Sequence, residues 1–186
     1  MKRIIWIYGL ISAAIAALNL AWVTIAFKDE AKTGAIDFGG LEWLGWVTLI
    51  LAYLVIYFAQ ASYRDNYSGG TITYGKAFKI GLFITLLSAA VYALVWVFIV
   101  WNVFPNFMET FSAMQIEKMK ASGKSAEDIA KTTREFSTYI ELYKNPFFVW
   151  GFTFLTEPLP VGLAATLISS FIVKLKKGKP QTAVRA

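Results

Sequence analysis

The chain has 186 residues, of which 57% are hydrophobic and 16% are charged, and its mean hydropathy is +0.53. Because soluble domains carry about a quarter charged residues, this composition excludes an ordinary soluble domain and makes the lipid bilayer the expected solvent. The sequence contains neither cysteine nor histidine, which excludes disulfides, thiolate chemistry, and the commonest general base and metal ligand.

Four apolar runs are each long enough to form a helix that crosses the hydrocarbon core, which takes about 20 residues. The predicted fold class is therefore an all-α integral membrane protein with four transmembrane helices, forming a single membrane domain over residues 1–186. Helix packing and satisfied backbone hydrogen bonds would hold such a bundle together. The spans are predicted at about residues 4–27, 43–61, 77–103 and 146–173.

The net charge of +6 is distributed unevenly along the chain. Basic residues precede the first run, dominate the connector between the second and third runs, and continue after the last run as a basic tail over residues 174–186. The other two connectors are acidic or balanced. Since positive charge is retained on the cytoplasmic side, both termini and the tail are predicted to be cytoplasmic, and nucleic acid is not a predicted partner.

The first run could also begin a secretory signal, because Lys2 and Arg3 precede it and Ala14-Ile15-Ala16 resembles a cleavage site. The apolar run continues unbroken to Phe27, however. That length favours a transmembrane span.

The connector between the second and third runs contains a partial phosphate-binding motif. Gly70–Lys76 matches the first seven places of G-x-x-x-x-G-K, but Ala77 stands where magnesium binding needs a Ser or Thr hydroxyl. No cofactor is therefore predicted. Arg64, Lys76 and Lys79 are instead predicted to contact anionic lipid headgroups or a partner at the cytoplasmic face.

Several motifs, taken in order and spacing, resemble a family of small four-span membrane proteins from Bacteroidota, catalogued as domain of unknown function 4199. The resemblance covers nearly the whole chain and implies a multi-pass protein of the bacterial inner (plasma) membrane. It implies no activity, because none defines the family. The motifs are Tyr63–Asn66, Gly69-Gly70, Thr73–Gly81, Pro105–Glu109, Met119–Gly123, Tyr143–Pro146 and Pro160–Gly162.

A helical hairpin is predicted between the third and fourth spans, over about residues 105–145 on the extracytoplasmic side. Pro105 suits a first helical turn, Gly123 suits the position after a helix, and Ser125–Asp128 has a capping-box pattern. The apolar faces could pack on each other and on the bundle, lie in the headgroup layer, or meet a partner chain. The candidate interface residues are Phe107, Phe111, Phe136 and Ile140.

The last apolar run is interrupted at Glu157, Pro158 and Pro160, which predicts a helix break near residues 156–157. At about 1.5 Å per residue, Glu157 lies roughly 25 Å from Lys174, within the outer leaflet. These three residues form a candidate intramembrane binding site, because a charged carboxylate in lipid is energetically costly and is therefore usually functional. The alternative interpretation is a helix cap that ends a short final span.

The leading functional hypothesis is a non-enzymatic membrane binding or scaffolding module that uses the outer hairpin. Its predicted partners are membrane lipids, a second copy in a homodimer, or a membrane or periplasmic protein. The alternative is a small carrier or channel for a proton, cation or lipid-like solute, with Glu157 as its binding group. An enzyme acting on a lipid is the third hypothesis, but no spacing of the acidic residues indicates a catalytic or metal site.

Overall fold

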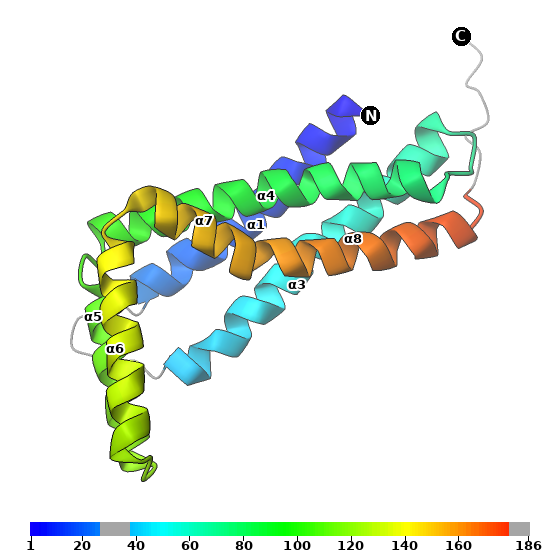
Figure 1. The fold of residues 1–186 in the computed structure, drawn as a ribbon. Helices are drawn as coiled ribbons and strands as arrows, with labels where there is room; N and C mark the ends of the chain where they lie inside the picture. The colour runs from blue at the N-terminus through cyan, green and yellow to red at the C-terminus, as the bar shows by residue number, and fades with distance from the viewer. Residues whose placement is uncertain (27–37, 179–186) are drawn as a thin grey trace.

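The computed structural model describes residues 1–26 and 38–178, and all the secondary structure in those two stretches is helical (Figure 1). The end of the predicted first span at residue 27 and residues 179–186 of the predicted basic tail lie outside the described residues. In chain order, the helices are α1 (Lys2–Ala26), α3 (Phe38–Tyr67), α4 (Tyr74–Asn102), α5 (Phe107–Ala121), α6 (Ala126–Tyr143), α7 (Pro146–Thr156) and α8 (Pro158–Leu175).

Four stretches of helix are long and apolar enough to cross a membrane, which confirms the predicted fold class. The fourth is formed by α7 and α8 together. The stretches are Lys2–Ala26, Trp43–Tyr67, Tyr74–Asn102 and Pro146–Leu175. The second span therefore continues past residue 61, its predicted end, and carries Arg64 on a helix.

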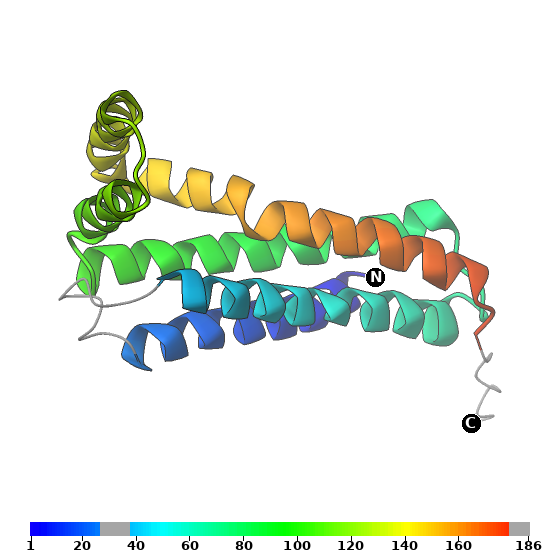
Figure 2. The same ribbon diagram turned by 90° about the horizontal axis from the view of Figure 1, so that it is seen from below.

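The central helix of the bundle is α4, which packs against α1, α3, α7 and α8. Figure 2 shows the long helices lying side by side. Every fourth position on one face of α4 is small or carries a hydroxyl, at residues 77, 81, 85, 89 and 93. Small side chains let helix backbones approach closely in a membrane, which explains why α4 can accommodate so many neighbours.

The outer surface of the bundle is apolar, as lipid contact requires. Exposed Leu10, Leu54 and Phe98 lie on three different helices. Exposed Trp6 and Trp22 stand at opposite ends of α1, and roughly 24 Å of helix separates them at about 1.5 Å per residue. Tryptophan prefers the membrane interfaces, so the two rings mark a hydrocarbon layer of ordinary thickness.

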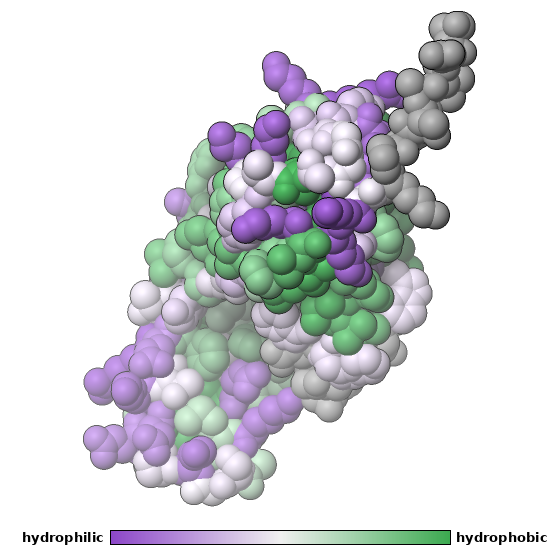
Figure 3. Space-filling view, turned by 90° about the vertical axis from the view of Figure 1, so that its right-hand side faces the viewer, coloured by the Kyte–Doolittle hydropathy of each residue, from purple (hydrophilic) through white to green (hydrophobic). Residues whose placement is uncertain are grey.

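The two ends of the bundle differ in composition. The basic end carries the start of α1, the α3–α4 connector and the end of α8, and Figure 3 views the molecule from that side, with hydrophilic residues gathered around it. At the opposite end, α5 and α6 form a helix pair, called the hairpin below, that runs across the direction of the bundle (Figures 1 and 2). The hairpin extends beyond the outline of the bundle in Figure 3.

Local sequence explains how the hairpin turns. Gly123 has a φ of +71°, a left-handed conformation that glycine adopts without strain. Ser125 is the N-cap of α6, and its hydroxyl accepts a hydrogen bond from the Asp128 amide at 3.1 Å. Lys124 N donates to Met119 O at 3.1 Å and closes the end of α5.

Candidate functional site

The four predicted hairpin residues take part in packing within the hairpin or line a cavity at its base. Phe107 stacks on Phe111 at 6.0 Å between ring centroids, and Phe111 meets Phe136 edge-on at 6.1 Å. Ile140 is partly buried and lines the cavity described below. Phe107, Phe111 and Phe136 thus join α5 to α6 rather than forming an exposed patch.

Tyr143 joins the hairpin to the bundle. Its ring stacks on Phe107 at 6.4 Å and contacts Phe148 and Phe152 of α7 at 6.3 and 6.5 Å between centroids. Burial raises the pKa of the Tyr143 hydroxyl above its ordinary value, and the nearby negative charge of Glu157 acts in the same direction. Tyr143 therefore remains a neutral hydroxyl between the hairpin and the fourth span.

A cavity of about 230 Å³ lies where the end of α4 meets α5 and α6. Its walls include the aromatic rings of Trp101, Phe107 and Tyr143, and its polar lining includes Glu109 and Lys144. Lys144 Nζ is also 2.6 Å from Glu141 Oε1. Sequence reasoning missed this site because residues from three helices form it. The only signal in the sequence was an acid near the start of the hairpin, Glu109, and a base at its end, Lys144.

Glu157 stands at the predicted helix break, between the end of α7 at Thr156 and the start of α8 at Pro158. It occupies the N-cap position of α8, but its carboxylate makes no capping hydrogen bond. The Tyr92 hydroxyl of α4 donates a hydrogen bond to Glu157 Oε2 at 3.0 Å. Glu157 is partly buried, Pro158 is buried and Pro160 is exposed.

One face of α3 carries three long polar side chains into the interior. Tyr53, Gln60 and Arg64 are 1%, 0% and 7% exposed. Their spacing of i, i+7 and i+11 places them on one side of the helix. This signal was present in the sequence, but a search for apolar periodicity does not detect it.

Small and hydroxyl-bearing residues of α4 and α8 face this polar stripe. Thr85 and Thr166 hydroxyl oxygens are 3.1 Å apart. Gln60 Nε2 donates to Ala77 O at 3.0 Å and to Ser170 Oγ at 2.9 Å, and Ser170 Oγ donates to Thr166 O at 2.6 Å. We call this set the polar seam: Tyr53, Gln60, Thr85, Ser88, Tyr92, Thr166 and Ser170.

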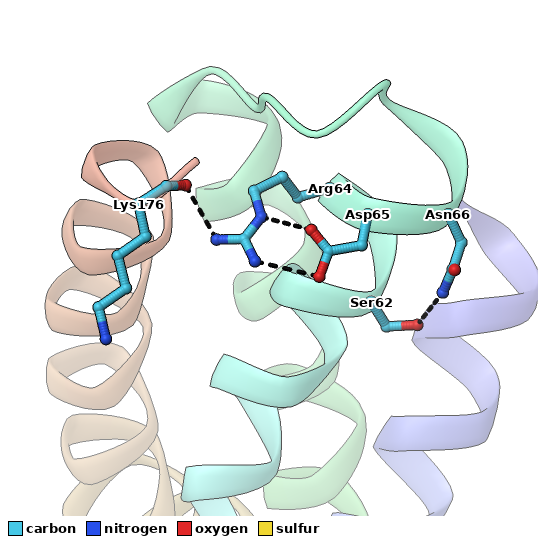
Figure 4. A network of polar contacts seen from close by, with 5 residues as sticks. All are labelled: Ser62, Arg64, Asp65, Asn66 and Lys176. Carbon is cyan, nitrogen blue, oxygen red and sulfur yellow. Dashed lines mark hydrogen bonds and ion pairs between the residues drawn. The ribbon is translucent and has the colours of Figure 1, made fainter. Parts of the chain in front are cut away.

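Arg64 closes the basic end of the bundle (Figure 4). Its Nε and Nη2 donate to the two carboxylate oxygens of Asp65 at 2.7 and 3.1 Å, and Nη1 donates to Lys176 O at 3.0 Å. The buried guanidinium thus ties α3 to the end of α8, and contact of Arg64 with lipid or a partner stays a prediction. Lys76 and Lys79 are exposed in the first turns of α4.

Comparison with known proteins supports the predicted family. Residues 7–175 match a family described as "Protein of unknown function (DUF4199)", which confirms the resemblance found in the sequence motifs. We found no match among curated proteins or solved structures. Within residues 1–26 and 38–178, no three acidic side chains gather as metal ligands would.

Proposed function

We propose that this chain, which belongs to the DUF4199 family of proteins of unknown function, is a non-enzymatic membrane module that binds a zwitterionic phospholipid headgroup. The binding site is the cavity at the base of the hairpin. The observation that carries the proposal is the pairing of aromatic walls with one acid and one base, Glu109 and Lys144, at this position.

The depth of the cavity suits a headgroup. Val100 and Trp101 belong to the last turn of α4, and Trp101 is 39% exposed. Exposed tryptophan marks the level where hydrocarbon gives way to headgroups. A lipid headgroup bound in this cavity would lie at the level of the surrounding headgroups, and its acyl chains would run along the apolar surface of the bundle.

The charges favour a zwitterion over an anion. Lys144 supplies a donor for phosphate, while Glu109 and the aromatic rings attract an ammonium group. The hairpin region over residues 104–145 contains six basic and six acidic residues. It therefore creates no strong positive field of the kind that recruits anionic lipid.

The cavity volume supports binding of a headgroup rather than a larger solute. At about 230 Å³ it is smaller than the about 300–1,000 Å³ of sites for drug-sized ligands. Phosphoethanolamine, with a primary ammonium and one phosphate, matches both the size and the paired charges. In this proposal the hairpin lies on the extracytoplasmic face and both termini are cytoplasmic, as the lysine distribution predicts.

Lipid retention in native mass spectrometry tests the proposal, with phosphatidylethanolamine and phosphatidylglycerol each added to the protein in mild detergent. Lys144→Ala should reduce the retained phosphatidylethanolamine several-fold. Lys120→Ala is the matched control, since Lys120 is another exposed hairpin lysine, 2.6 Å from a glutamate three residues earlier, but does not line the cavity.

Glu109→Gln should also lower phosphatidylethanolamine retention, because it removes the ammonium partner and keeps the side-chain shape. Equal retention by Lys144→Ala and Lys120→Ala would refute the site. Preferential retention of phosphatidylglycerol by the wild type would refute the zwitterionic specificity.

A further inference from the structure

The polar seam contains more polarity than helix packing needs. A serine or threonine at a helix crossing adds little stability through its hydrogen bond, whereas long polar side chains in a span are costly and mark functional paths. Tyr53 and Gln60 are both fully buried. Apolar side chains of similar size would fill the same positions without a desolvation cost.

Two buried atoms of the seam have no hydrogen-bond partner within the described part of the chain, Tyr53 Oη and Gln60 Oε1. The Tyr53 hydroxyl lies near Ser88 and within electrostatic range of Tyr92, without a well-formed hydrogen bond to either. Buried polar atoms of this kind are ordinarily satisfied by internal water, which makes about three hydrogen bonds.

The seam runs between two charged sites. Near the hairpin end, Tyr92 donates to Glu157 at 3.0 Å. Near the basic end, Gln60 is one helical turn from Arg64, which pairs with Asp65. Between these ends, the Thr85–Thr166 and Gln60–Ser170 contacts measure 3.1 and 2.9 Å. No direct hydrogen bond joins Tyr92 to Thr85 or Gln60 to Arg64 in the described part of the chain, and the unpartnered Tyr53 Oη and Gln60 Oε1 lie at these two steps.

We propose that the polar seam, completed by water at Tyr53 and Gln60, conducts protons between Glu157 and the Arg64–Asp65 pair. This function involves a site separate from the lipid cavity and does not depend on lipid binding. A proton from the hairpin side forms an O–H bond on the Glu157 carboxylate. That O–H bond breaks as the proton passes on, and each hydroxyl or water then accepts one proton and releases another. At the basic end the proton forms an O–H bond on the Asp65 carboxylate, which is 32% exposed and releases it to bulk water. One positive charge crosses, every group returns to its starting state, and no redox partner is needed.

A proton suits this path better than a metal cation. Proton transfer needs only neighbouring donors and acceptors at hydrogen-bond distance, as between Tyr92 and Glu157. A metal cation would need several oxygen ligands at one point, whereas the seam contacts at Thr85–Thr166 and Tyr92–Glu157 join oxygen atoms in pairs. Two titratable groups that face Glu157 are Tyr92 of α4 and Tyr143 of α6.

Purified protein in liposomes that enclose a pH-sensitive dye tests the proposal. A potassium gradient with valinomycin supplies the driving voltage, and internal acidification is compared with that of empty liposomes. The wild type should acidify the interior faster, and Glu157→Gln should return the rate to that of empty liposomes. Wild-type protein that does not exceed empty liposomes would overturn the proposal.

Tyr53→Phe separates proton transfer from packing. If Tyr53 only fills space, removing its unpaired hydroxyl should leave the melting temperature unchanged or raised and the proton flux unchanged. If it holds a water in the path, flux should fall while the melting temperature does not. A stable Tyr53→Phe variant with wild-type flux would therefore overturn the proposal.

Thr85→Val is a second test that keeps the shape of the side chain and removes a seam hydroxyl. Thr48→Val is its matched control, because the Thr48 hydroxyl donates to Leu44 O within its own helix at 2.9 Å and lies outside the seam. The proposal requires Thr85→Val to lower flux and Thr48→Val to leave it unchanged. A flux that depends on an imposed sodium gradient, with no voltage-driven acidification of the interior, would show a cation path and overturn the proton assignment.

Discussion

Gly162→Ala tests a close contact between the fourth span and the rest of the bundle. A Cβ added at Gly162 would lie 2.9 Å from both Thr85 Oγ1 and Tyr53 Cζ, and closer still to Thr85 Cγ2. Real Cβ atoms essentially never approach other heavy atoms within 3.0 Å, so α8 must move away from α4 or the facing side chains must leave their positions.

The expected loss can be estimated from two effects. Overpacking in a filled interior costs about 1–3 kcal/mol, and losing the Thr85–Thr166 hydrogen bond costs about 0.6 kcal/mol more in a membrane. Alanine also favours helix by about 1 kcal/mol over glycine, which partly hides the effect. Gly151→Ala corrects for this, because Gly151 lies on α7 of the same span and no atom falls within 4 Å of its added Cβ.

Thermal unfolding of both variants in the same detergent provides the measurement. Since both gain helix propensity, their difference isolates the clash, and Gly162→Ala should be less stable than Gly151→Ala by about 2–4 kcal/mol. Equal stability of the two variants would refute the close crossing of α4 and α8. It would also remove the geometric basis for the seam.

Two further predictions concern the ends of the molecule. Arg64→Lys should lower the free energy of unfolding by about 1–3 kcal/mol, because lysine cannot make the bidentate pair with Asp65 and also reach Lys176 O. The control Lys79→Gln, at an exposed lysine, should change thermal unfolding little. Similar losses of stability in both variants would contradict the internal role of Arg64. Phe136→Asp should open the hairpin and speed proteolysis near Gly123, because it places a charge against Phe111. Lys131→Asp, on an exposed side of α6, should not, and the hairpin packing would be wrong if both variants resisted proteolysis equally.

The sequence predicted the elements whose causes are local. The apolar runs indicated the four spans, and Glu157 before Pro158 marked the break in the last one. Gly123 and Ser125 likewise indicated the turn of the hairpin and the start of α6. Each of these depends on a few neighbouring residues, so no knowledge of tertiary contacts was needed.

What the sequence did not reveal depends on residues that are distant along the chain. Arg64 was assigned to a solvated connector because charge usually ends an apolar run, but adjacent Asp65 neutralises it and α3 continues to Tyr67. Tyr53 and Gln60 can lie together in the interior only because small residues of α4 and α8 pack opposite them. The cavity likewise requires α4, α5 and α6 together.

Tyr143 lies between the two proposed sites. Its ring lines the cavity, it stacks on Phe107, and its hydroxyl lies within electrostatic range of Glu157. A headgroup that moved this ring would also change the surroundings of the carboxylate, so lipid and proton binding would be linked and each would alter the other by the same factor. Lys144→Ala distinguishes the cases, because it weakens lipid binding without touching the seam. Unchanged proton flux in that variant, with and without phosphatidylethanolamine, would show two independent sites, whereas flux that responds to the lipid only in the wild type would identify Tyr143 as the connection.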